Sequence, residues 1–143
     1  MILRHFTVTI ALCLAAAPLA AATSAPKPIM GDWITDGGKS IVRIQGCGAN
    51  MCGRIVKILK PDPAAPKTDT NNPDPALRAR PLAALQILTD FVPDSAKWIG
   101  SIYDPRSGRT YKSKASLLPD NTLQVEGCIA FFCQGQVWTR APS

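Results

Sequence analysis

The feature that most constrains the fold of this chain is a two-residue alternation of apolar and polar side chains along its length. In TYKSKASL, residues 110–117, Tyr111 and Leu117 fall on one face and the lysines fall on the other. Successive side chains of a β-strand point to opposite faces, so this alternation is typical of a strand with one buried face. Turn sequences such as DPRSG and LPDNT separate the runs. The sequence therefore predicts an all-β domain of antiparallel strands.

We expect about eight strands, from the number of such runs that lie between turn signals. They lie near residues 30–35, 40–46, 53–60, 83–90, 97–103, 109–117, 121–127 and 134–140. Sequential antiparallel strands in a short chain favour a small up-and-down barrel over a sandwich, since closure removes the exposed sheet edges.

The apolar faces of these strands are expected to line the barrel interior. The predicted lining residues are Val42, Ile44, Val56, Ile58, Ile102, Tyr111, Ala115, Leu117, Leu123 and Val125. A barrel of eight strands is either filled by its own side chains or holds one small ligand. The alternation does not decide between a filled core and a cavity, so both stay open.

Residues 60–81 interrupt the strand pattern. This segment contains six prolines, which cannot donate to a sheet ladder, so we expect a long loop. Loops of this length within a compact domain are uncommon and are usually functional or loosely ordered. Asp74 followed by Pro75 predicts a single helical turn near residues 74–79, with Asp74 as its N-cap.

The first 22 residues have the features of a signal peptide. Arg4 precedes an apolar run, and Ala20-Ala21-Ala22 fits the small-residue pattern of a cleavage site. The apolar run is short for a bilayer span, so we expect cleavage and no membrane span in the mature chain. The mature protein is then a single β-barrel domain, residues 23–143, in the periplasm or secreted.

Cleavage would leave four of the five cysteines: Cys47, Cys52, Cys128 and Cys133. An even number in an exported protein indicates disulfides. Neither pair forms a C-x-x-C redox motif, and the expected export favours disulfides over a zinc site. Of the three connectivities that four cysteines allow, we expect Cys47–Cys52 and Cys128–Cys133, because each pair brackets a turn and can close a hairpin.

The sequence predicts no enzyme, no cofactor and no metal site. The one histidine, His5, lies in the expected signal peptide, which removes every Ser-His or Cys-His arrangement from the mature chain. No nucleophile-elbow, P-loop or dinucleotide-binding motif occurs. The net charge of +6 is scattered along the strands. Nucleic-acid binding is not expected, because it needs cations clustered with aromatic residues.

The two ends of the domain resemble a calycin or lipocalin-like signature. GDWIT carries Gly31 and Trp33 near the start, and WTR carries Arg140 near the end. The resemblance implies that the guanidinium stacks over the indole and closes the base of an eight-stranded calycin/lipocalin-like barrel, a cation–π contact.

More specifically, the chain resembles the bacterial family known as "domain of unknown function 2147". The matching stretches are GDWITDGGKSIVRI, CGANMCGRIVKI, NNPDPALRARPL, IYDPRSGRTYK and GCIAFFCQGQVWTR. The chain departs from the family pattern at Ala84 and Asp90, where glycine is usual, and between Trp98 and Tyr103, which is one residue short. These departures are expected to affect the fourth and fifth strands. Membership implies an exported barrel and supplies no known activity.

We therefore expect a monomeric, non-enzymatic barrel that binds a small apolar or amphiphilic ligand. The alternative is a filled barrel that acts as a protein-interaction or protease-inhibitor-like envelope protein. In that case its partner would be contacted by the proline-rich loop or by the N-terminal segment, residues 23–30.

Overall fold

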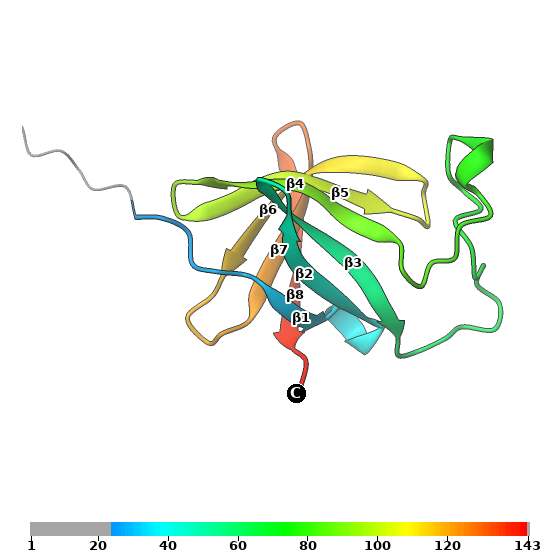
Figure 1. The fold of residues 1–143 in the computed structure, drawn as a ribbon, viewed down its shortest axis with the longest axis horizontal. Coiled ribbons are helices and arrows are strands. Elements are labelled where there is room, and N and C mark those ends of the chain that lie inside the picture. Colours follow the sequence, from blue (N-terminus) through cyan, green and yellow to red (C-terminus); the bar gives the residue numbers. More distant parts are fainter. Residues whose placement is uncertain (1–23, 143) are drawn as a thin grey trace, which may run out of the picture.

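The alternating runs form the strands of one closed antiparallel barrel (Figure 1). The structure is a computed structural model that describes residues 24–142, so the expected signal peptide, residues 1–22, lies outside the described residues. Each strand pairs with its neighbours in the chain, and β1 also pairs with β8, which closes the barrel. This confirms the predicted all-β, eight-stranded fold.

The eight strands match the predicted runs, with ends that shift by a few residues. Their bounds are β1 Gly31–Ile34, β2 Ser40–Cys47, β3 Asn50–Ile58, β4 Gln86–Asp94, β5 Lys97–Asp104, β6 Arg109–Leu117, β7 Leu123–Ile129 and β8 Phe132–Arg140. Two short 3-10 turns, η1 (Asp36–Gly38) and η2 (Pro75–Leu77), are the helical segments among the described residues. The Asp74 carboxylate accepts a hydrogen bond from the Ala76 amide at the start of η2, as an N-cap does.

The position of Val56 differs from the sequence prediction. It was predicted to face the interior, and it is 40% exposed. The cause is a β-bulge: Val42 pairs with Ile55 and Ile41 pairs with Lys57, which leaves Val56 without a partner on β2. The extra residue shifts the alternation, so Ile55 points inward in its place and is 7% exposed.

Two of the departures from the family pattern, at Ala84 and Asp90, fall where the backbone is left-handed. Ala84 has a φ of +79° and Asp90 has a φ of +56°. Glycine adopts such angles without a steric penalty, aspartate tolerates them, and alanine does so least readily. Asp90 also lies within the register irregularity of β4 against β5, between Thr89 and Val92. The chain therefore keeps the conformation that glycine would favour at both positions.

Large apolar side chains form a packed core inside the barrel. The buried set comprises Ile29, Trp33, Val42, Ile44, Met51, Ile55, Leu85, Ile87, Leu88, Phe91, Ala115, Leu123, Val125 and Trp138. Glycines make room for them: a Cβ on Gly100 would lie 2.5 Å from the Phe91 ring, and one on Gly53 would lie 2.8 Å from the Leu88 side chain. This core does not fill the whole interior, because several of its members also line a cavity that opens at one end of the barrel.

Candidate ligand-binding site at the open end of the barrel

The chain preceding β1 closes one end of the barrel. Ile29 is fully buried there, and its carbonyl accepts a hydrogen bond from Trp33 Nε1 at 2.8 Å. Trp98 Nε1 donates to the Lys27 carbonyl at 2.9 Å, which ties the same segment to β5. Residues 27–30 are therefore part of the barrel floor.

The three residues of the terminal signature lie together at this closed end. The Arg140 guanidinium lies 4.0 Å from the centre of the Trp33 ring, and its Nη1 donates to the Met30 carbonyl at 2.7 Å. Gly31 has a φ of +127°, and a Cβ there would overlap the Arg140 guanidinium. The first and last strands thus meet through a cation–π contact that requires glycine beside it.

The opposite end holds a cavity of about 460 Å³ that is open to solvent. The residues that line it from the barrel wall are mainly apolar: Val42, Ile55, Ile87, Ile102, Val125 and Trp138. The loops around the mouth add polar groups, which include Thr35, Asp36, Lys39, Ser40, Asp104 and Arg106. Gln134 and Gln136 of β8 also face it. A cavity of this size, with an apolar wall and a few polar groups, is typical of small-molecule sites.

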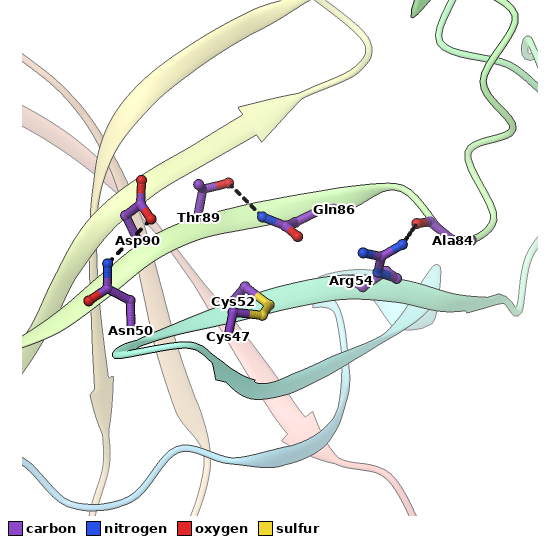
Figure 2. The surroundings of a disulfide bond; sticks show 8 residues. All are labelled: Cys47, Asn50, Cys52, Arg54, Ala84, Gln86, Thr89 and Asp90. Atoms are coloured by element: carbon purple, nitrogen blue, oxygen red, sulfur yellow. Dashed lines mark hydrogen bonds between the residues drawn. A yellow bond between two sulfur atoms is a disulfide. The ribbon is translucent and has the colours of Figure 1, made fainter.

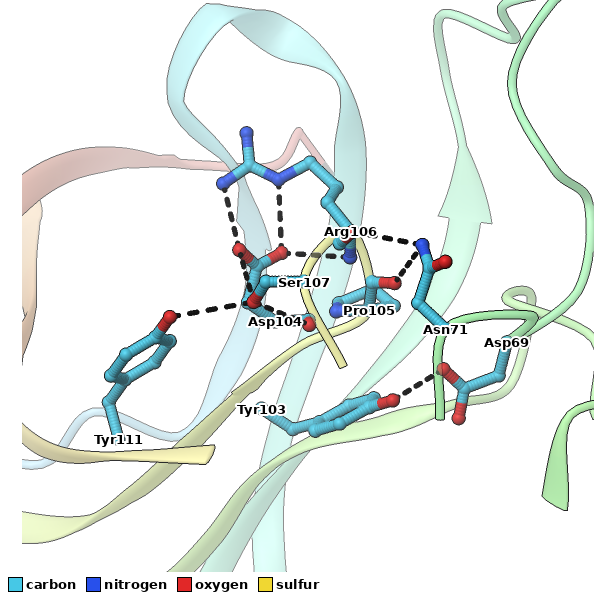
Figure 3. A network of polar contacts seen from close by, with 8 residues as sticks. All are labelled: Asp69, Asn71, Tyr103, Asp104, Pro105, Arg106, Ser107 and Tyr111. Carbon is cyan, nitrogen blue, oxygen red and sulfur yellow. Dashed lines mark hydrogen bonds and ion pairs between the residues drawn. The ribbon is translucent and has the colours of Figure 1, made fainter. Parts of the chain in front are cut away.

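The β5–β6 turn forms a polar network on the rim (Figure 3). Asp104 accepts hydrogen bonds from Arg106 Nε at 3.0 Å and from Arg106 Nη2 at 3.3 Å. Burial alone would raise the pKa of Asp104, but the hydrogen bonds from Arg106 outweigh it and hold the pKa below its usual value. The Tyr111 hydroxyl lies 3.4 Å from Ser107 Oγ. The rim therefore presents a charged pair beside hydroxyl groups.

The proline-rich loop supports this rim through a buried carboxylate. Asp69 is fully buried and accepts three hydrogen bonds: from the Tyr103 hydroxyl at 2.6 Å, from Arg80 Nη2 at 2.7 Å and from Asn72 Nδ2 at 2.8 Å. Burial raises the pKa of Asp69, but these donors together lower it below its usual value. Tyr103 lines the cavity, and its pKa is raised by burial and by the neighbouring carboxylate. The loop is thus ordered against the cavity wall.

A second contact joins the loop to the β5–β6 turn. Asn71 Nδ2 donates to the Arg106 carbonyl at 2.9 Å and to the Pro105 carbonyl at 3.4 Å. Gly108 has a φ of +68°, and a Cβ there would overlap the Asn71 carbonyl. Glycine is needed at this position both for its backbone conformation and for the close approach of the loop.

The structure places the predicted interior residues in three environments. Val42, Ile102, Tyr111 and Val125 line the cavity. Ile44, Ala115 and Leu123 are buried in the packed core, and Ile58 and Leu117 pack partly buried against it. Val56 lies outside. Sequence reasoning missed Ile55, Ile87 and Trp138, although Trp138 follows the alternation of β8 and could have been found. The rim residues carry no sequence signal, because loops bring them together.

The four cysteines pair within their hairpins. Cys47 and Cys52 are joined at the β2–β3 hairpin, with Cα atoms 5.8 Å apart (Figure 2). Cys128 and Cys133 are joined across β7 and β8, with Cα atoms 4.0 Å apart. Close to the first pair, Asn50 Nδ2 donates to Asp90 Oδ1 at 3.3 Å, and it links β3 to β4.

Residues 24–142 contain neither a cluster of metal-binding side chains nor a helix suited to crossing a membrane. No group of three or more histidine, cysteine, aspartate or glutamate side chains is arranged to hold a metal ion. Within the same range, no helix has the length and apolar character needed to cross a membrane.

A closed antiparallel barrel with an arginine stacked over a first-strand tryptophan, and with one open end, is a lipocalin-like fold. A solved structure with the same fold is that of a protein from the human pathogen Helicobacter pylori, described as belonging to the lipocalin family. The two chains are 18% identical, with a TM-score of 0.70, and the match covers 81% of this chain and 84% of that chain. At this identity the likeness concerns the fold alone.

The chain belongs to the bacterial family described as "Uncharacterized protein conserved in bacteria (DUF2147)", whose sequence profile matches residues 31–140. This confirms the resemblance seen in the sequence motifs. No curated protein matches the chain.

Proposed function

We propose that the protein is an exported, non-enzymatic barrel that binds one small amphiphilic ligand in the cavity at its open end. The observation that carries the proposal is the division of that cavity into an apolar wall and a polar rim. An apolar chain or ring would bury surface against Ile55, Val125 and Trp138, which is favourable in proportion to the area removed from water. A polar head would remain among the groups of the β5–β6 turn.

The rim favours a ligand with a polar or charged head. Lys39 and Arg106 can attract an anionic group, and the Asp104 carboxylate and the Tyr111 hydroxyl can accept or donate hydrogen bonds. A fully apolar ligand would leave these groups without partners from the ligand, which costs binding free energy if they lose water. The chemistry of the rim therefore supports an amphiphile over a simple hydrocarbon.

Two disulfides support the proposed location outside the cytoplasm. Disulfides form and persist in oxidising compartments and are rare in the cytoplasm. Together with the signal-peptide features of residues 1–22, they support the periplasm or secretion.

The alternative of a filled barrel with an inserting N-terminal segment has less support. Residues 27–30 of that segment are held in place by hydrogen bonds from the indoles of Trp33 and Trp98 and by the burial of Ile29. A segment packed in this way cannot extend into a partner without opening the barrel floor.

The proposal can be tested by a substitution that fills the cavity, made at a glycine where the backbone has room for a side chain. Gly127 lines the cavity, and a Cβ there would be in ordinary contact, 3.5 Å from Ile102 Cγ2 and 3.9 Å from Tyr111 Cβ. We expect the unaltered protein to bind one molecule of anilinonaphthalene sulfonate, an amphiphilic anion, with an increase in fluorescence. Gly127→Leu should weaken this binding by about tenfold or more, because about 1.4 kcal/mol of apolar burial is lost.

Gly46→Leu is the matched control, since a Cβ at Gly46 meets no atom within 4 Å and the residue is outside the cavity. It should bind the probe as the unaltered protein does. Equal binding by both variants would contradict the proposal. Native mass spectrometry of protein purified from its own host gives a second check: a mass equal to the bare chain, together with no probe uptake, would also count against it.

A further inference from the structure

The tip of the β7–β8 hairpin exposes three large apolar side chains. Phe131 is fully exposed, Phe132 is 71% exposed and Ile129 is 64% exposed. They are consecutive but for Ala130, and they lie in the segment enclosed by Cys128 and Cys133, here called the apolar tip, residues 129–132. Contiguous exposed apolar side chains on a soluble protein often mark a surface that contacts a partner or a membrane.

The hairpin cannot hide these side chains by folding back. Ile129 pairs with Phe132 across the turn, and Cys128 is bonded to Cys133 directly behind it. Ala130 has a φ of +51°, as the tight two-residue turn requires. Because the loop is closed covalently, it is too short to bring Phe131 to the core. Figure 1 shows this hairpin as the orange loop that rises above the strands in front of it.

Basic residues lie on the strand beside the apolar tip and at the cavity mouth. Lys112 of β6 pairs with Cys128 at the base of the apolar tip, and Arg109 begins the same strand at this end of the barrel. Lys39 and Arg106 line the cavity mouth together with Ile129 and Phe132. The acidic residues of that mouth are Asp36 and Asp104, and the second of these is paired with Arg106. The apolar tip is therefore set in a surface with an excess of positive charge.

We propose that the apolar tip docks the protein on an anionic lipid surface. Phe131 enters the interface between headgroups and acyl chains, where aromatic side chains are favoured. Arg109 and Lys112 contact the anionic headgroups, each with an attraction of the size known for basic residues close to such a membrane. The combination of an apolar insertion and flanking cations is typical of proteins that lie on a membrane surface.

Docking in this way would place the cavity mouth against the membrane, because Ile129 and Phe132 belong to both surfaces. The docking proposal rests on exposure and charge and does not require the cavity to be occupied. If the proposed ligand binding also holds, an amphiphile could pass between the membrane and the cavity without crossing open water.

The first test measures insertion of the tip. Protein purified from cells that express the full chain is mixed with vesicles of phosphatidylcholine containing one-third phosphatidylglycerol. In Phe131→Trp, the new indole should shift its emission to shorter wavelength on binding, and lipids with brominated acyl chains should quench it. Phe131→Ser should bind these vesicles about tenfold or more weakly than the unaltered protein, because burial of a phenylalanine side chain is lost. Val137→Ser, at an exposed apolar position farther along β8, should bind unchanged.

The second test measures the contribution of charge. Arg109→Gln and Lys112→Gln should each weaken binding about fivefold. Lys97→Gln, which changes a lysine next to Trp98 at the closed end, should have no such effect. Vesicles of phosphatidylcholine alone should bind much more weakly than the anionic ones, and added salt should reduce the difference.

Several results would overturn the docking proposal. One is vesicle binding that is absent, or that is equal for the unaltered protein and Phe131→Ser. Another is a dimer in solution that Phe131→Ser dissociates, since the tip would then be a contact between two copies. Phe131 does not line the cavity, so Phe131→Ser should still bind anilinonaphthalene sulfonate. Lost vesicle binding with retained probe binding therefore separates the two proposals.

Discussion

The buried carboxylate of Asp69 helps to order the proline-rich loop, whose composition alone does not favour a fixed structure. Three donors reach its carboxylate: Asn72 and Arg80 from the same loop, and Tyr103 from β5. A buried carboxylate is stable only when such donors replace the water it has lost. The proline-rich loop is therefore fixed to the cavity wall by this side chain, in addition to the contact of Asn71 with the β5–β6 turn.

At this scale we predict that Asp69→Asn destabilises the protein by about 2 kcal/mol at pH 7, because charge-assisted hydrogen bonds are lost. The pKa of Asp69 is lowered in the folded protein, so its contribution is complete above the unfolded value of about 3.9 and is lost as the pH falls through the folded value. The difference in unfolding free energy between the two proteins should therefore shrink in acid. Urea denaturation at pH 7 and near pH 3 measures it.

Asp94→Asn, at an exposed carboxylate in the β4–β5 hairpin, serves as the control and should change stability little at either pH. A difference for Asp69→Asn that is the same at both pH values would contradict the assigned role of the carboxylate.

At the scale of elements, the two disulfides act on opposite ends of the barrel. Cys47–Cys52 closes the β2–β3 hairpin, and Cys128–Cys133 holds the β7–β8 hairpin at the cavity mouth. Each bond encloses a short loop, and a short loop restricts the unfolded chain less than a long one does. The disulfides thus stabilise hairpins and are not what holds the barrel closed.

We predict that replacing either cysteine pair with serine lowers the free energy of unfolding by about 2 kcal/mol and leaves the barrel intact, because the chain-entropy term for so small a loop is of that size. Chemical denaturation measures the loss, and far-ultraviolet circular dichroism should be unchanged. Non-reducing peptide mapping tests the pairing itself: a peptide that joins the 47–52 region to the 128–133 region would show a different connectivity.

At the scale of the whole molecule, the two termini of the domain complete one structure. β1 pairs with β8, the Ala141 amide donates to the Asp32 carbonyl at 3.0 Å, and Arg140 covers Trp33. These contacts remove the free edges that an open sheet of this kind would expose. Closure therefore depends on residues that are more than a hundred positions apart in the sequence.

We predict that Arg140→Met lowers the free energy of unfolding by about 1–2 kcal/mol, since it removes the cation–π contact with Trp33 and the hydrogen bond to the Met30 carbonyl. Urea denaturation followed by tryptophan fluorescence measures the change. Arg109→Met, at an exposed position on β6, is the matched control and should alter stability by less than about 0.5 kcal/mol. Equal effects from the two substitutions would count against the closing role of Arg140.

The sequence by itself determined the strands, their order and the barrel. Alternation and turn residues act locally, so Tyr111, Leu123 and Val125 could be assigned to an inner face without knowledge of the rest of the fold. The helical turn after Asp74 could be assigned in the same way, because an N-cap and a proline at the first position are local signals. The alternation predicted the wrong face for Val56, because a bulge in the pairing of β3 with β2 shifts the pattern there.

Only the tertiary structure decided whether the barrel is filled and what surrounds its mouth. Side-chain packing on the closed side depends on small residues such as Gly53 and Gly100, which receive large neighbours from β4. The rim is assembled from four separate parts of the chain, and the contact between Asp69 and Tyr103 spans 34 positions. No local pattern encodes such contacts, because their energy exists only after the barrel has closed and brought the loops together.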